Sequence, residues 1–512
     1  MRKELSIFSI GMMLVLAGCK HDQNKFDRIE DRIANIYPDY SSITIPVNIA
    51  PLNFIIQEGA DDYKARFSGR GKTVFTRNSN NGKIIIPIKK WKRLLNENKG
   101  DSILIDISIK KEQQWISFRA IKNYVSTDSV DSYLVYRKIN SALTLWNDMS
   151  IMQRSTETYE ESAILENKNT DGNCMHCHAF QHHNPKNMVL HLRTPPGGTY
   201  IRSNDSVRWL STKTPYTLAS FAYPAWHPTK NYIAFSVNNI HQLMYGSGDR
   251  LNYVYDTSSD IVVYDVTNNL VFTSPKISGK DLENLPNWSP DGSFLYYINC
   301  PEDRQKTDGI RVKYDLMRIP FNVDTHEWGQ PDTLLSSNQT GLSITFPEAS
   351  PDGRFIVFCM ADYGYFTIGN SSSDQYILDL RDGKYRKLDI NSRQTESFHN
   401  WSLNSRWLVF ASKRDDGITT LPYFTHIDAN GKESKPFVLP SKDPGSLLTR
   451  LFNYNRPVLV TGKIKVSQKE MLSDIYGPTE NVVFDSTTIH PDSVSLRYKP
   501  DDGNESSIYK KH

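Results

Sequence analysis

Long hydrophobic runs are missing from this 512-residue sequence after its first segment, so nothing there reaches the roughly 20 apolar residues that a membrane helix needs. Cysteine is scarce, and the five cysteines lie too far apart to form a disulfide-stabilised scaffold. Neither charge is in excess, because 60 basic and 57 acidic residues are spread along the chain, which argues against nucleic-acid binding. A G-x-S-x-G elbow and a P-loop are also missing, which argues against a serine peptidase and a nucleotide triphosphatase.

The N-terminus carries the features of an export signal. Arg2 and Lys3 precede the apolar run Leu5–Leu16. That run is too short to cross a bilayer, but it suits the core of a signal peptide. We therefore expect residues 1–18 to be removed on export.

A cysteine follows this run directly. The small residues before Cys19 resemble the bacterial lipobox, in which the cysteine is lipidated and becomes the new N-terminus. The resemblance also implies an outer-membrane anchor, because Lys20 is not the aspartate associated with inner-membrane retention. We expect a cell-envelope protein that is held at the membrane by its lipid, with residues 19–41 as a tether. The alternative is an ordinary buried cysteine after a hydrophobic start.

The composition, with 38% hydrophobic residues, is that of a folded protein of several domains. Residues 42–130 contain short apolar or alternating segments separated by Gly and Asn clusters, and this pattern predicts a small β domain. Residues 131–212 differ, because large apolar residues between Tyr133 and Leu165 recur at spacings of three and four. We predict a helical segment there, followed by a loop region that carries the cysteine motif described below.

Four stretches in the second half align position by position, and each is followed by a strand pattern. They are Tyr223–Pro228, Leu285–Pro290, Phe346–Pro351 and Phe398–Leu403. The stretches recur roughly every 50 to 60 residues, a period that suits four-stranded propeller blades with insertions. The Pro-Asp-Gly turns at Pro290–Gly292 and Pro351–Gly353 would feed a buried strand, and the Trp of each repeat would pack between blades.

These repeats resemble the WD40-like (PD40) blades of TolB-type propellers. The resemblance implies five or six blades over residues 213–464, with degenerate blades near Thr199–Leu210 and Leu448–Gly462. A polar tail, residues 465–512, would follow. The predicted fold is therefore mainly β, with an N-terminal β domain, a helical or loop segment and a propeller. Isolated Trp-Ser-Pro turns in a β-sandwich are the alternative.

The chemistry of the sequence is concentrated in Asn173–His178, which contains a CxxCH motif. This is the pattern of c-type haem attachment, in which Cys174 and Cys177 would form thioethers with the two vinyl groups and His178 would be the proximal iron ligand. Met188 and His191 are the candidates for the distal position.

Two other interpretations of the motif remain open. Cys174, Cys177 and His178 could hold a structural zinc ion together with His182 or His183. A catalytic dithiol is the other, although no thioredoxin-like βαβ pattern surrounds the motif. Cys300 and Cys359 each follow a blade strand, so we predict buried free thiols.

An ordered set of motifs extends the resemblance over most of the mature chain. Ile45–Phe54, Tyr133–Arg137, Asn173–Phe180 and the later blades look like the TolB-like lipoproteins of Bacteroidota, which are often labelled as cytochrome c or PD40 proteins. This family implies a CxxCH segment ahead of a propeller and little about activity.

Two functions follow as expectations. The first is an anchored lipoprotein with one covalent haem c that transfers or senses electrons, while the propeller docks a protein or redox partner. The second is a non-enzymatic scaffold with a structural Cys/His site, filled by zinc. An enzyme is disfavoured because no second metal cluster is visible.

Overall fold

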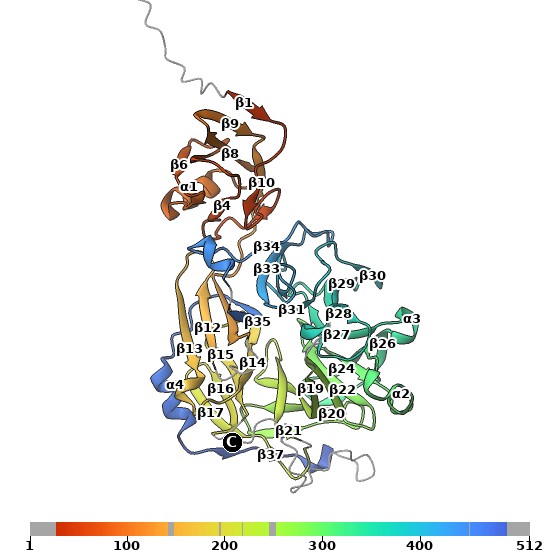
Figure 1. Cartoon of the computed structure of the whole chain (residues 1–512). Coiled ribbons are helices and arrows are strands. Elements are labelled where there is room, and N and C mark those ends of the chain that lie inside the picture. The colour runs from red at the N-terminus through yellow and green to blue at the C-terminus, as the bar shows by residue number, and fades with distance from the viewer. Residues whose placement is uncertain are drawn as a thin grey trace, which may run out of the picture.

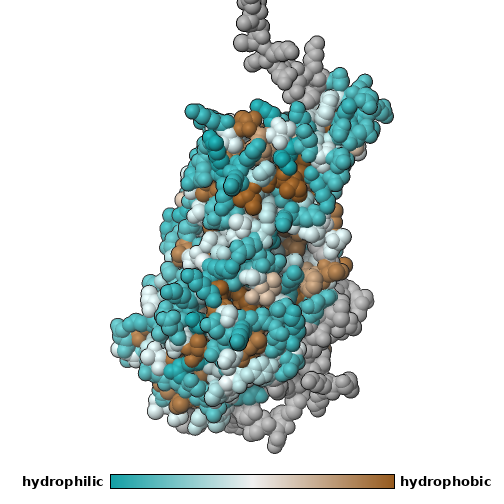
Figure 2. Space-filling view, turned by 90° about the vertical axis from the view of Figure 1, so that its left-hand side faces the viewer, coloured by the Kyte–Doolittle hydropathy of each residue, from teal (hydrophilic) through white to brown (hydrophobic). Residues whose placement is uncertain are grey.

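The computed structural model describes residues 27–141, 148–193, 196–217, 219–244, 252–449 and 451–488. Two lobes are evident in Figure 1, an N-terminal lobe above and a larger lobe of many small sheets below. Cys19 lies outside the described residues. No helix among those residues is long and apolar enough to pass through a membrane. The face drawn in Figure 2 is mostly hydrophilic, with apolar residues in small scattered groups.

The N-terminal lobe is a β domain that begins with β1 (Arg28–Glu30), so residues 28–41, which were predicted to be part of a tether, belong to this domain and contribute Ile36 and Tyr40 to its core. A seven-stranded sheet is accompanied by a three-stranded sheet and by helix α1 (Ile88–Glu97), which buries Trp91, Leu94 and Leu95. The larger sheet contains β1 (Arg28–Glu30), β3 (Thr44–Ile45), β5 (Asp62–Gly69), β6 (Phe75–Ser79), β8 (Ser102–Lys111), β9 (Gln114–Phe118) and β10 (Ile121–Val125). The smaller sheet contains β2 (Ile36–Tyr37), β4 (Phe54–Ile56) and β7 (Lys83–Ile84).

The larger lobe is a β-propeller, and within the described residues it has six blades. Blade 1 is β35 (Phe452–Val460), β11 (Tyr133–Asn140), β12 (Met149–Ser155) and β13 (Glu161–Glu166); blade 2 is β14 (Met175–Phe180), β15 (Asn187–Leu192), β16 (Gly198–Ser203) and β17 (Ser206–Ser211); blade 3 is β18 (Phe221–Trp226), β19 (Tyr232–Met244), β20 (Asn252–Asp265) and β21 (Leu270–Phe272). Blade 4 is β22 (Leu282–Trp288), β23 (Phe294–Cys300), β24 (Asp315–Asn322), β25 (Glu327–Trp328) and β26 (Asp332–Leu335); blade 5 is β27 (Ser343–Ala349), β28 (Phe355–Ala361), β29 (Asp374–Asp379) and β30 (Lys384–Lys387); blade 6 is β31 (Glu396–Trp401), β32 (Trp407–Ser412), β33 (Leu421–His426) and β34 (Phe437–Val438).

The ring is closed by strands from opposite ends of the chain. β35 comes from the C-terminal part and pairs antiparallel with β11, so blade 1 combines one late strand with three early ones. The expected degenerate blades are real, because β16 and β17 cover Thr199–Leu210 and β35 lies within Leu448–Gly462. The propeller therefore begins at Tyr133, well before the predicted start at residue 213.

The predicted helix between Tyr133 and Leu165 is wrong, because this segment forms β11, β12 and β13. Burial along Met149–Ser155 alternates from one residue to the next, which is the period of a strand. The apparent helical spacing arose from joining Tyr133 and Tyr136 of β11 with Met149 and Met152 of β12. Leu143 and Trp146, which contributed to it, lie outside the described residues.

The tail predicted for residues 465–512 also contains regular structure as far as it is described. Helix α4 (Gln468–Ile475) begins with a capping box between Ser467 and Glu470, and it buries Met471 and Ile475 against blades 1 and 2. The short strands β36 (Glu480–Asn481) and β37 (Val483–Phe484) extend the edges of blades 2 and 3. The remaining short helices lie in connections: α2 (Glu302–Asp308), α3 (Ser337–Thr340), η2 (Asn167–Asn169), η3 (Gln181–His183), η4 (Gly309–Arg311), η5 (Thr367–Gly369), η6 (Pro444–Leu447) and η7 (Ser486–Thr488).

The turn and the Trp of the repeat have the roles that the sequence predicted. In blade 4 the hydroxyl of Ser289 donates to Asp291 and accepts the backbone N–H of Phe294, while Gly292 has φ 76°. The indole Nε1 of Trp288 donates to the carbonyl of Ala225 at 3.1 Å, which ties blade 4 to blade 3. This turn joins the end of β22 to the start of β23.

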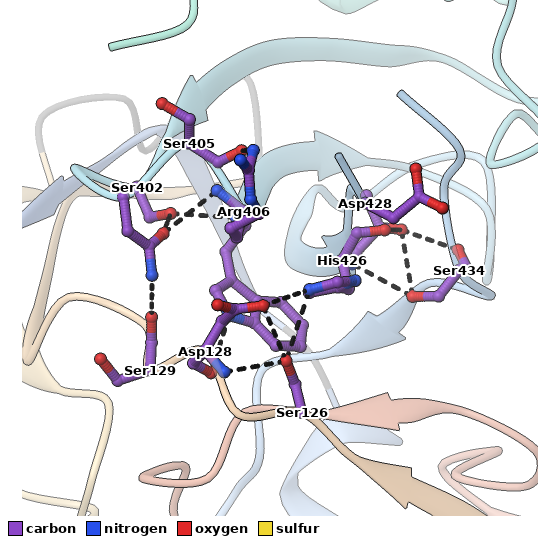
Figure 3. Close-up of polar contacts among 12 residues, drawn as sticks. Ser126, Asp128, Ser129, Ser402, Ser405, Arg406, His426, Asp428 and Ser434 are labelled. Atoms are coloured by element: carbon purple, nitrogen blue, oxygen red, sulfur yellow. Dashed lines mark hydrogen bonds and ion pairs between the residues drawn. The ribbon is translucent and has the colours of Figure 1, made fainter. Parts of the chain in front are cut away.

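The two lobes share one apolar core and a polar junction. The core of the N-terminal domain is continuous with Trp401, Trp407 and Phe410 of blade 6. Figure 3 shows the polar contacts, in which His426 Nε2 lies 2.9 Å from Asp128 Oδ2 and 3.4 Å from Ser126 Oγ. Because the same imidazole nitrogen meets both residues, this Ser-Asp-His group is not a catalytic triad, in which the two partners occupy different ring nitrogens. We interpret it as a structural contact between the lobes.

Candidate functional site

One feature recurs in the first strand of every blade. Each strand contains a β-bulge whose first residue has a positive φ, between 48° and 57°. The bulges are Cys177-His178, Tyr223-Pro224, Leu285-Pro286, Phe346-Pro347, Phe398-His399 and Arg456-Pro457. Proline suits the second position because a bulge interrupts the hydrogen-bond ladder. Positive φ is strained for these residue types, and such strain is often found at functional sites.

The CxxCH motif therefore belongs to the propeller repeat. Cys177-His178-Ala179-Phe180 takes the place that Tyr223-Pro224-Ala225-Trp226 takes in the next blade. This equivalence was not predicted from the sequence, where the motif was assigned to a segment ahead of the propeller. The matching Ala and the aromatic residue after it were the signal that could have shown it.

The six bulges surround one central cavity of about 210 Å³. Its wall combines the bulge residues with aromatic rings and a small set of ionisable side chains. The ionisable residues are His178, His182, His183, Glu348, His399 and Arg456. Convergence of rigid apolar walls and a few polar groups is typical of a ligand site.

His178 is the most unusual member of this wall. Its side chain is 1% exposed, and neither ring nitrogen makes a hydrogen bond of acceptable geometry to a described residue. Burial lowers the pKa of His178 to about 3, and the positive charges of Arg456 and Arg137 act in the same direction, against a smaller opposite effect from backbone groups of Arg456 and Val135. An unpartnered buried imidazole is costly, so this ring is available to bind a group that enters the cavity.

Glu348 and Arg456 bring opposite charges to the same wall. Glu348 Oε1 accepts hydrogen bonds from Asn400 Nδ2 at 2.5 Å and from the backbone N–H of Trp401 at 3.2 Å. Burial raises the pKa of Glu348 to about 7, although these hydrogen bonds and the charges of His183 and Arg456 lower it in part. Glu348 is therefore a carboxyl group that changes charge near neutral pH.

The other histidines of the wall have partners. His183 Nδ1 lies 3.2 Å from Asp131 Oδ2 and 2.9 Å from the carbonyl oxygen of Leu459. The bond and the charge of Asp131 outweigh burial, and the pKa of His183 is raised. His399 lies 2.9 Å from the carbonyl of Val357 and 3.8 Å from Cys359, and burial lowers its pKa to about 4.

The two cysteines of the motif lie on opposite faces of blade 2. Cys174 is part of the apolar core between blades 1 and 2, together with Met149 and Met188. Cys177 faces blade 3, where its sulfur accepts the backbone N–H of Tyr223 at 3.5 Å. Neither cysteine lines the central cavity that His178 faces.

His176 and Arg193 hold the second thiol in place. Arg193 Nε donates to His176 Nε2 at 2.6 Å, so the proton of the neutral imidazole is on Nδ1, which points at Cys177 Sγ at 2.6 Å. Burial lowers the pKa of His176 well below its usual range, with a further contribution from Arg193. Cys177 thus accepts hydrogen bonds and lies in a closed environment.

The distal candidates are separated in the same way. Met188 is paired with Phe180 in the ladder and belongs to the core on the side of blade 1. His191 is paired with His176, accepts or donates a hydrogen bond with Thr199 Oγ1 at 3.0 Å, and has its pKa lowered to about 3 by burial. Neither lines the cavity.

The arrangement does not fit the predicted cofactors. A haem c needs both thiols at one edge of the ring and the histidine beneath it, whereas Cys174 and Cys177 face different blades and neither lines the cavity that His178 faces. For the zinc alternative, the described residues contain no group of three or more His, Cys, Asp or Glu side chains placed to hold a metal ion. Cys174, Cys177, Cys300 and Cys359 are all buried free thiols.

Comparison with known proteins adds weak likenesses. No family model matches the chain, and no curated protein matches it. Solved structures that resemble it include a hydrazine synthase of Kuenenia stuttgartiensis, with a TM-score of 0.40, 10% identity and coverage of 61% of this chain and 47% of that one. The β-propeller domain of the trilobed protease of Pyrococcus furiosus has a TM-score of 0.35 and 11% identity, covering 65% and 87%. An auxiliary nutrient binding protein of Bacteroides thetaiotaomicron has a TM-score of 0.33 and 10% identity, covering 79% and 99%. With such low scores, the propeller assignment rests on the sheets themselves.

Proposed function

We propose that this chain is a lipid-anchored, non-enzymatic binding protein of the cell envelope, and that its ligand occupies the central cavity of the propeller. The observation that carries this proposal is the convergence of a strained bulge from each of the six blades on one cavity. Positive φ at a non-glycine residue strains the backbone, and packing alone gives no reason to repeat that strain in every blade. A bulge, by contrast, can redirect side chains toward a ligand.

The chemistry of the wall supports the same conclusion. His178 has two unpartnered ring nitrogens, and Glu348 titrates near neutral pH. Groups with perturbed pKa values that share a cavity are candidates for binding or catalysis. Both cysteines of the motif lie outside the cavity, and the hydroxyl of Ser289, which lines it, is engaged in the blade turn by Asp291 and by the backbone N–H of Phe294. Binding is therefore the better supported role.

A cavity-filling variant tests this proposal. Ala349 lines the cavity and stands where blade 4 has Trp288, so Ala349→Trp introduces a side chain that the blade repeat already accommodates. We would purify both proteins after export in a host with c-type assembly machinery, denature them, and compare the released small molecules by mass spectrometry. A compound present with wild type and lost with Ala349→Trp supports the cavity. Equal release from both proteins contradicts it.

The covalent haem hypothesis is the second candidate, and the unpartnered imidazole of His178 favours it. For this hypothesis, β14 must leave the sheet of blade 2 so that Cys174 and Cys177 reach one side. It predicts haem that survives denaturation in the same preparation, detected by haem staining and a pyridine haemochrome spectrum. An electron-transfer function and a redox partner depend on that result. Haem-free protein leaves the propeller as the functional part.

A further inference from the structure

We propose that the central cavity binds a small monoanionic carboxylate, whose charge is taken by Arg456. This inference rests on the proposed function, because it names the class of ligand for the same cavity. It deepens that proposal by three observations: an uncompensated cation, an unpartnered hydrogen-bonding ring, and apolar walls of limited volume.

The uncompensated cation is Arg456. It is the first residue of the bulge in β35, with φ 50°, so the strained backbone presents this side chain to the cavity. Among the described residues its guanidinium group makes no hydrogen bond and no ion pair. Its charge nevertheless lowers the pKa values of both His178 and Glu348, which places it near both. A half-buried guanidinium group without a partner is suited to bind an anion.

The histidines of the cavity wall are either uncharged or already paired with an acidic residue. His178 and His399 are held neutral, since burial lowers their pKa values to about 3 and 4. His182 has a lowered pKa for the same reason. His183 is charged more readily, but it faces Asp131. One positive charge therefore remains for a ligand.

A single charge favours a monoanion over a phosphate dianion. The planar guanidinium group matches a carboxylate in a two-bonded arrangement, while a dianion would leave one negative charge beside Glu348 without compensation. His178 can donate from one ring nitrogen to the carboxylate and accept at the other. The remaining wall is rich in proline, with Pro224, Pro286, Pro347 and Pro457, so the body of the ligand should be small and apolar.

Glu348 makes the binding depend on pH. The charged and titratable groups that face Glu348 are Arg456 from β35, His183 from η3, His178 from β14 and His399 from β31. His183, whose pKa is raised, also loses its charge as the pH rises, but it is paired with Asp131, so the unpaired group that changes charge near pH 7 in the cavity is Glu348. Its ionised form repels a carboxylate, so affinity should fall as the pH rises.

The test uses benzoate as the probe, with isothermal titration calorimetry on the full exported chain at pH 6. Benzyl alcohol and benzylammonium serve as neutral and cationic analogues, and terephthalate as a dianion. We expect benzoate to bind more tightly than all three. Arg456→Gln should weaken benzoate about tenfold or more and remove its advantage over benzyl alcohol. Arg456→Lys should recover part of the affinity, because lysine restores the positive charge but lacks the two parallel N–H donors of the guanidinium group.

Asp256→Asn is the matched control variant. Asp256 is also a buried carboxyl whose pKa is raised to about 7, but it bonds to Asn238, Asn284 and Tyr365 and does not line the cavity. Benzoate affinity should be unchanged in this variant. Equal benzoate affinity in wild type and Arg456→Gln overturns the inference, and so does tighter binding of the dianion terephthalate.

Failure of the inference can be told apart from failure of the proposed function. If benzyl alcohol binds wild type but not Ala349→Trp, and Arg456→Gln changes nothing, the cavity binds ligands and the carboxylate assignment is wrong. If Ala349→Trp binds every probe as wild type does, the cavity is not the site and both proposals are wrong.

Discussion

Replacement of Glu348 by Gln should change how the stability of this protein depends on pH. Glu348 carries a pKa of about 7 in the folded chain because it is buried in the cavity wall, compared with the ordinary value of 4.5. The folded state thus holds a proton that the unfolded state releases between pH 4.5 and pH 7. The stabilisation is fully present below pH 4.5 and is lost as the pH rises to 7.

The size of the effect follows from the two pKa values. One pKa unit corresponds to about 1.4 kcal/mol, so the shift from 4.5 to about 7 amounts to about 3 kcal/mol between acidic and neutral pH. Gln keeps the shape and can accept the hydrogen bond that Asn400 donates to Oε1. Relative to wild type, Glu348→Gln should therefore gain about 3 kcal/mol between pH 4.5 and pH 8.

Urea unfolding followed by the fluorescence of the nine tryptophans measures this difference. The two proteins should be compared at several pH values, because other buried carboxyl groups cancel in the difference. Asp256→Asn should show a similar trend, since its carboxyl has a similar pKa. Parallel curves for wild type and Glu348→Gln from pH 4.5 to pH 8 would refute the reasoning.

Four further predictions concern other parts of the chain. His178→Pro gives blade 2 the bulge residue that four other blades have, so it should fold with unchanged or slightly higher thermal stability; loss of several kcal/mol would contradict the equivalence of the bulges. Trp288→Phe removes the hydrogen bond to Ala225 across blades 3 and 4 and should cost about 1–2 kcal/mol in urea unfolding, with an unchanged midpoint as the opposing result. Asp128→Ala removes the shorter of the two polar contacts of His426 Nε2 at the junction and should cost about 1 kcal/mol in the same assay. Cys19→Ser should abolish acylation, so that the exported chain is found in the soluble fraction, and retention in the membrane fraction would show another anchor.

The sequence was informative where the repeat is strong. The aligned stretches from Tyr223 onward located the first strands of blades 3 to 6, and the predicted role of Trp is confirmed by the contact of Trp288 with Ala225. These features are local, because a Ser-Pro-Asp-Gly turn and the strand after it are specified by neighbouring residues. The mainly β fold and the propeller therefore followed from the sequence alone.

Blades 1 and 2 were not predicted from the sequence, because the contacts that define them are not local. The closing strand β35 lies more than three hundred residues from its partner β11, and no short pattern reports such pairing. In blade 2 the Trp and Pro of the repeat are replaced by Phe180 and His178, which disguises it. The spacing of Cys174 and Cys177 coincides with a haem motif, whereas their separation onto two faces depends on the bulge at Cys177.

The candidate site was predicted only in part for the same reason. His178 was predicted to be a haem ligand. In the structure it lines the cavity, and neither of its ring nitrogens makes a hydrogen bond to a described residue. Glu348 and Arg456 were missed, because their importance arises from meeting His178 across three different blades. Only the closed ring brings these residues together.

Intact mass spectrometry of the denatured protein, after export in a host with c-type assembly machinery, tests the central claim most directly. If Cys174 and Cys177 belong to opposite faces of a blade strand, the mass is that of the processed and acylated polypeptide alone, and reagents for free thiols label both cysteines after denaturation. An added mass of one haem, with both thiols blocked, would contradict the account and show that blade 2 takes a different structure in the mature protein.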